Sequence, residues 1–87
     1  MSLVLETPPP GTPHLARIAG IRLVSAAPAL WRIVDRSGRV IGHLQAIDHD
    51  QGVRYRARRF HAPTRAFRDL GEFWCADDAV ESVAFAR

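Results

Sequence analysis

Polar and apolar residues alternate most clearly in residues 52–60, GVRYRARRF. Because successive side chains of a strand point to opposite faces, one face of this segment would carry Val53, Tyr55 and Ala57. The other face would carry Arg54, Arg56 and Arg58. The segment therefore predicts a strand with one buried face and a row of cations on the other.

Residues 30–48, LWRIVDRSGRVIGHLQAID, show the strongest local signal for a hairpin. Two β-rich runs flank DRSG, whose glycine suits the left-handed position of a three-residue loop, residues 36–38. Asp35 would then face Arg39 across the strands. This register pairs Ile33 with Ile41 and Trp31 with His43 on one face, and Val34 with Val40 and Leu30 with Leu44 on the other. A second turn, DHDQG, leads into the arginine segment, so residues 30–60 predict a three-stranded antiparallel meander.

The predicted register leaves the character of the arginine face open. If Ile47 lies opposite Val53, the arginine face also carries Leu44 and Val40 from the neighbouring strand. Either a β-bulge near Gly42 changes the alternation, or residues 15–24 cover part of that face.

The remaining segments complete the predicted fold. Residues 1–13 hold four prolines between Thr7 and Pro13 and predict a flexible lead-in. We interpret residues 18–24 as an extended piece, although a helix also fits the pattern around them, and FRDLGEF as a short fourth strand. The segment CADDAVESVAFAR, residues 75–87, has two acidic residues in its first turn and predicts a helix with a narrow apolar stripe, Ala76, Ala79, Val80, Val83 and Ala84.

Residues 14–87 thus predict a single small α+β domain, a three- or four-stranded antiparallel sheet packed on one C-terminal helix. The meander and helix together resemble the sheet-and-helix DNA-binding domain of plant ethylene-response factors. They are also similar to the amino-terminal arm-binding domain of tyrosine-type phage integrases. The matching residues are Tyr55, Ala57, Leu70, Gly71, Phe73, Asp78, Ala79 and Val80. The resemblance implies that the helix covers one sheet face and that Arg54, Arg56 and Arg58 contact DNA from the other.

The charge of the chain is positive but mild. The 87 residues contain 12 basic residues, all arginine, against 9 acidic ones, for a net charge of +3. Lysine and asparagine are both absent, which is typical of a GC-rich genome. The number of arginines therefore says little about phosphate binding, and their arrangement has to carry that argument.

The single cysteine, Cys75, has no internal partner for a disulfide, and no apolar run approaches the roughly 18 residues of a membrane span. The N-terminal residues lack the basic and apolar regions of a signal peptide. We expect a cytoplasmic protein.

Few residues suggest catalytic or metal chemistry. The turn Asp48–Asp50 with His43 and His61 contains metal-ligand residue types, but neighbouring residues of a turn point in different directions, so we expect no metal site and no cofactor. Nothing orients a base beside Cys75, so we expect no enzyme. Trp31 and Trp74 could stack on nucleic-acid bases, although a role in the core or at the start of the helix is the simpler interpretation.

The sequence therefore predicts a small non-catalytic protein that binds nucleic acid, in recombination, repair or regulation. Duplex DNA would contact an arginine-rich face free of acidic side chains, made of Arg54, Arg56 and Arg58 with Arg32 and Arg39 from the hairpin. Two alternatives stay open. The arginines could simply keep a sheet face in water, or the exposed face or an edge strand could bind an acidic protein or a second copy of the chain.

Overall fold

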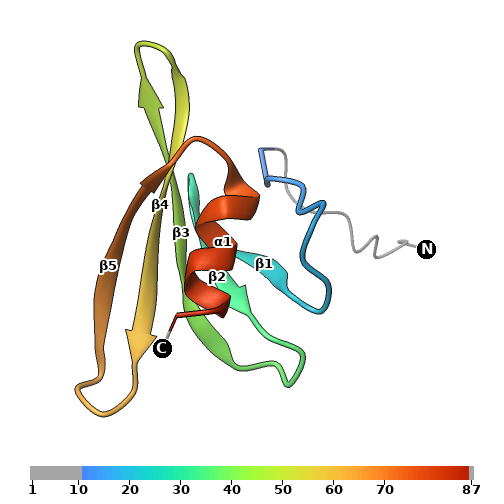
Figure 1. Cartoon of the computed structure of the whole chain (residues 1–87), viewed down its shortest axis with the longest axis vertical. Helices are drawn as coiled ribbons and strands as arrows, with labels where there is room; N and C mark the ends of the chain where they lie inside the picture. The colour runs from blue at the N-terminus through green and yellow to red at the C-terminus, as the bar shows by residue number, and fades with distance from the viewer. Residues whose placement is uncertain (1–10, 87) are drawn as a thin grey trace.

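Five antiparallel strands follow one another in chain order and a helix ends the chain (Figure 1). The computed structural model describes residues 11–86, so residues 1–10 of the predicted lead-in lie outside the described residues. The elements are β1 (Arg22–Ala27), β2 (Leu30–Val34), β3 (Val40–His49), β4 (Gly52–His61), β5 (Ala66–Phe73) and α1 (Ala76–Ala84). The predicted α+β class is confirmed, with five strands in place of three or four.

The extra strand is β1, which starts at Arg22 and so begins later than the extended piece predicted for residues 18–24. Gly20 has a φ of +80°, a left-handed conformation that a strand does not contain. The chain therefore straightens only after this glycine, and β1 then pairs with β2 with one irregularity, between Ser25 and Ala27.

The loop between β2 and β3 forms as predicted. Gly38 has a φ of +86°, and its N–H donates to the carbonyl oxygen of Asp35 at 3.0 Å. The Asp35 carboxylate accepts hydrogen bonds from the Ser37 hydroxyl, at 2.7 Å, and from the backbone N–H groups of Ser37 and Arg39. These bonds, that of the Ser37 hydroxyl first, lower the pKa of Asp35.

The predicted pairing of β2 with β3 is wrong by one residue beyond the first pair. Val34 lies opposite Val40 as expected, but Ile33 lies opposite Gly42, so Ile41 is the extra residue of a β-bulge. The bulge left open by the sequence is therefore present. It reverses the alternation that follows, and Leu44 joins the helix side of the sheet, where it is fully buried.

The turn after β3 is also tighter than predicted. Asp48 lies opposite Val53 and His49 opposite Gly52, which shifts the pairing of β3 with β4 by one residue. Leu44 accordingly lies opposite Ala57 rather than beside the arginines. Leu44 therefore does not share the arginine face. That face still carries Leu30, opposite Gln45, and Ile47, opposite Arg54.

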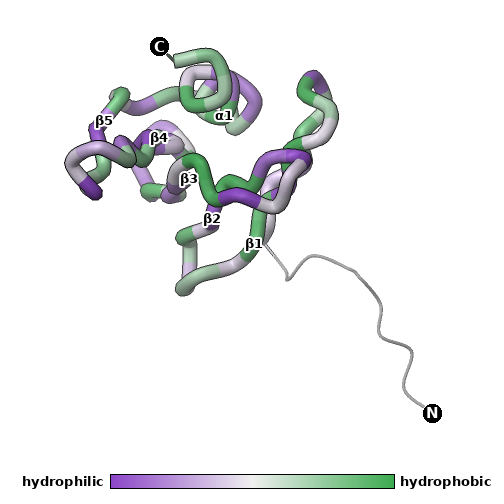
Figure 2. The backbone as a smooth tube through the Cα atoms, turned by 90° about the horizontal axis from the view of Figure 1, so that it is seen from below, coloured by the Kyte–Doolittle hydropathy of each residue, from purple (hydrophilic) through white to green (hydrophobic). Residues whose placement is uncertain are grey.

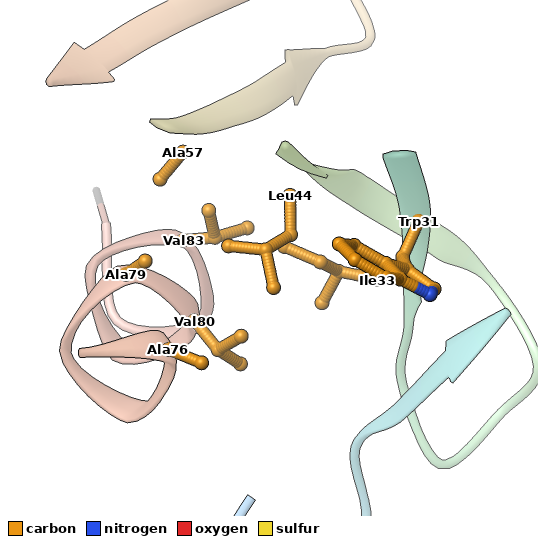
Figure 3. Close-up of a cluster of buried hydrophobic side chains, with 8 residues drawn as sticks. All are labelled: Trp31, Ile33, Leu44, Ala57, Ala76, Ala79, Val80 and Val83. Atoms are coloured by element: carbon orange, nitrogen blue, oxygen red, sulfur yellow. The ribbon is translucent and has the colours of Figure 1, made fainter. Parts of the chain in front are cut away.

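The core lies between α1 and the sheet, where Val80 and Val83 of the helix face Ile33 and Leu44 (Figure 3). The predicted stripe is confirmed for four of its five residues, because Ala76, Ala79, Val80 and Val83 are buried, whereas Ala84 is half-buried. Small side chains let helix and sheet approach closely. At Gly42, a Cβ atom would lie 2.3 Å from the carbonyl oxygen of Arg58 and 2.7 Å from Val83 Cγ1.

The segment before β1 packs on the same side as the helix. The backbone N–H groups of Ala16 and Arg17 donate to the Asp77 carboxylate at 3.0 Å, and these bonds, that of Arg17 first, lower the pKa of Asp77. The Arg17 guanidinium forms ion pairs with Asp78 and Glu81.

An end-on view places α1 on one side of the sheet (Figure 2). Within residues 11–86, no helix has the length and apolar character needed to cross a membrane.

Candidate nucleic-acid interface

The sheet face turned away from α1, here called the open face, carries the three alternating arginines of β4. Ala57 is fully buried under the helix and Tyr55 packs against the same core. Because neighbouring residues of a strand point to opposite faces, Arg54, Arg56 and Arg58 lie on the open face. The predicted alternation of β4 is confirmed, but Val53, expected on the buried face, is 40% exposed.

A row of three cationic or titratable side chains crosses the open face from β2 to β4. Arg32 lies opposite His43, and His43 lies opposite Arg58. We call these three residues the cationic row. With neighbouring strands about 4.8 Å apart, its two arginines are separated by roughly 10 Å at the backbone. Burial, and then the charges of Arg32 and Arg58, lower the pKa of His43.

Arg39, the fifth predicted contact residue, is not brought into this row. It lies in the loop between β2 and β3, before the first residue of β3, and is exposed. Its backbone is fixed by the bonds to Asp35 described above. The structure therefore unites four of the five predicted arginines on one face and leaves Arg39 at its end.

The expectation that this face is free of acidic side chains is wrong. Glu72 of β5 lies opposite Arg56, and their Oε2 and Nη2 atoms are 2.8 Å apart. Glu72 Oε1 also lies 3.7 Å from Arg54 Nε, and Asp69 Oδ2 lies 3.9 Å from Arg56 Nε. A bulge in β5 opposite Ala57 and Arg58 places both carboxylates on the open face.

The ion pairs divide the arginines into two groups. Arg54 and Arg56 are held by Glu72, and Arg54 Nη2 also donates to the Glu72 carbonyl oxygen at 3.0 Å. Within residues 11–86, the ion pairs of this face include neither Arg32 nor Arg58. The cationic row is therefore the part of the face whose charge is available to a partner.

Aromatic rings lie beside the cationic row. His43 and Phe67 stack across β4 with ring centroids 4.2 Å apart and an interplanar angle of 19°, and Phe60 lies 5.4 Å from Phe67. Phe67 remains 42% exposed. The sequence did not point to Phe67, because its position beside His43 depends on how β5 pairs with β4. The only sequence signal for Phe67 was its position two residues before Asp69 in FRD, which puts both side chains on one face of a strand.

The two tryptophans have different roles. Trp31 is buried in the core as expected, and its Nε1 donates to Thr12 Oγ1 at 3.1 Å. Trp74 lies between β5 and α1, yet it is 53% exposed. The Arg54 guanidinium lies 4.5 Å from the centre of the Trp74 ring, a cation–π contact that holds the ring beside the open face.

Other chemistry-bearing residues form no comparable site. Among residues 11–86, no group of three or more His, Cys, Asp or Glu side chains is placed to hold a metal ion. A shallow hollow of about 330 Å³ at the β4–β5 turn is lined by His61, Thr64, Ala66, Phe67 and Arg68. There, His61 Nδ1 and Thr64 Oγ1 form a hydrogen bond of 2.9 Å.

Comparisons of the chain with models of protein families, with curated proteins and with solved structures found no match. The fold agrees in one respect with the DNA-binding domains that the sequence resembles. It is a small antiparallel sheet with a C-terminal helix packed on one face.

Proposed function

We propose that the chain binds nucleic acid through its open face and does no chemistry on it. The observation that carries the proposal is the cationic row on a face that α1 leaves uncovered. Its two arginines flank His43, and neither has an acidic partner among residues 11–86. Arginine side chains in such a row can contact successive phosphates, because phosphate contacts require positive charge at regular spacing and little else.

The charges of the open face favour a small contact area with nucleic acid. On β2, β4 and β5, four arginines of this face lie among two carboxylates, and Glu72 holds two of those arginines. We therefore expect few phosphate contacts and an affinity in the micromolar range typical of nonspecific binding. A part in recombination, repair or regulation fits such a module and belongs to the same proposal.

A protein-interaction module is the second candidate. The edge of the sheet favours it, because among residues 11–86 β1 pairs only with β2 and presents Val24, 39% exposed, beside its outer edge. An unpaired edge can add a strand from a partner or from a second copy of the chain. Contact through that edge would depend on backbone hydrogen bonds and apolar side chains rather than on the cationic row.

Salt separates the two candidates. We propose to titrate the native chain with a labelled oligonucleotide at about 50 and 200 mM salt, and to measure its oligomeric state under the same conditions. Nucleic-acid binding through the row should weaken with a slope of roughly one per phosphate contact. Absence of binding below about 100 μM, or binding that ignores salt, would remove the proposal in favour of the interaction module.

A further inference from the structure

Two exposed aromatic rings mark the ends of the charged part of the open face. Phe67 stacks on His43 at one end of β5, and Trp74 packs under Arg54 just beyond its other end. Both remain accessible, with exposed fractions of 42% and 53%. At about 3.3 Å per residue, their separation of seven positions spans at most roughly 23 Å. Cations and flat apolar rings therefore occur together on one surface.

The width of the sheet favours one form of nucleic acid over another. The cationic row lies on β2, β3 and β4, and a further strand flanks it on each side. Five strands about 4.8 Å apart extend over roughly 19 Å. The major groove of DNA is about 12 Å wide and admits a helix or a two-stranded ribbon, so this sheet is too broad to enter it with its central strands.

We propose that the open face binds single-stranded nucleic acid, with unpaired bases stacking on Phe67 and Trp74 and phosphates contacting Arg32 and Arg58. This rests on the proposed function and names the form of nucleic acid. Unpaired bases expose flat faces that stack on aromatic rings without regard to sequence, whereas the bases of a duplex are already stacked on each other.

The charge of the face agrees with this ligand. A single strand presents one line of phosphates, and each contact weakens less with salt than a contact to duplex DNA, with a slope of about 0.7 against 0.9. Two available arginines suit a short contact of this kind. The neighbouring Asp69 carboxylate, about half exposed, also lies where it can accept a hydrogen bond from the amino group of an unpaired base.

The test compares a mixed-sequence single strand of about 12 nucleotides with the duplex of the same sequence. Native chain and the variants Phe67→Leu and Trp74→Leu are titrated with both. Phe85→Leu is the matched control, because Phe85 is 70% exposed but follows α1 on the covered side. Trp74 fluorescence adds a readout that needs no substitution, since the other tryptophan, Trp31, is buried.

We expect the native chain to prefer the single strand, with quenching of Trp74 fluorescence on binding. Each of the two leucine substitutions should weaken single-strand binding roughly five- to hundredfold, and Phe85→Leu should leave it unchanged. Equal or tighter binding of the duplex, unaffected by both substitutions, would overturn this inference and leave the proposed function standing. Absence of binding to either form would overturn both, and binding only to an acidic protein would replace them.

Discussion

Arg56 and Glu72 lie directly opposite each other on β4 and β5, with their Nη2 and Oε2 atoms 2.8 Å apart. The pairing of two strands thus neutralises an arginine that the sequence assigned to ligand contact. Two residue pairs further along, Arg58 lies opposite Asp69, yet the ion pair of Asp69 is with Arg56. The pairing of β5 with β4 therefore determines which arginines of the open face remain available to a partner. These are Arg32 and Arg58 of the cationic row.

Replacing Glu72 by Gln should strengthen nucleic-acid binding. The substitution removes a negative charge from the open face and releases Arg54 and Arg56 from their ion pairs with Glu72. We expect affinity at low salt to rise several-fold, while stability falls by no more than about 1 kcal/mol, as for ion pairs that are partly exposed. Parallel titration and thermal unfolding of the variant check this. A drop in affinity would mean that Glu72 is needed to hold the arginines in their binding positions.

Replacing Leu44 by Ala should destabilise the fold strongly. Leu44 is fully buried between Trp31 and Ala57 under α1, so its removal leaves a cavity that costs about 2–5 kcal/mol. Ile47→Ala is the matched control, because Ile47 alternates to the open face and is only half-buried. Urea unfolding of both variants measures the difference. If Ile47→Ala proved the more damaging change, the bulge at Ile41 and the resulting register would be wrong.

The pH dependence of stability and that of binding should have opposite signs. Burial and the neighbouring arginines lower the pKa of His43, so the folded state favours its neutral form. Stability is then complete above the unfolded value of about 6.5 and is lost as the pH falls toward the folded pKa. Protonation also adds a charge between Arg32 and Arg58, which should strengthen phosphate binding.

The substitution His43→Leu tests the predicted pH dependence of both stability and binding. Unfolding and oligonucleotide titrations of the native chain and this variant between about pH 7.5 and pH 5.5 should differ in slope, with the variant flatter in each. Identical slopes for the two proteins would assign the effects to other groups.

The sequence predicted the elements better than their pairing. The loop at residues 36–38, the alternation of β4 and the small-residue stripe of α1 follow from local chemistry: a left-handed glycine, a period of two and a helical spacing. The bulge at Ile41 was one of two alternatives that the sequence left open around Gly42. The close approach of Val83 to Gly42 joins residues 41 positions apart in the chain. Local patterns do not contain that contact.

The dependence on contacts between distant segments also explains why the candidate site was predicted only in part. Arg54, Arg56 and Arg58 were evident from alternation, and Arg32 from the hairpin, but the partners of each depend on registers with β3 and β5. Glu72, His43 and Phe67 became relevant only when those registers placed them beside the arginines. The side chains of a sheet face are visible in the sequence one strand at a time, and their grouping across strands is not.

The most direct test of the account is a comparison of two double variants with the same loss of charge. Arg32→Gln with Arg58→Gln removes the arginines of the cationic row, whereas Arg36→Gln with Arg65→Gln removes two exposed arginines from the turns. Titrations of a single-stranded oligonucleotide are made for both at about 50 and 200 mM salt.

The account predicts that the row variant loses most of its affinity and that its salt slope falls by roughly 1.4, the value for two lost contacts to a single strand. The turn variant should keep the native slope. Equal losses in both variants would show that only net charge matters, and unchanged binding in the row variant would contradict the assignment of the open face as the nucleic-acid interface.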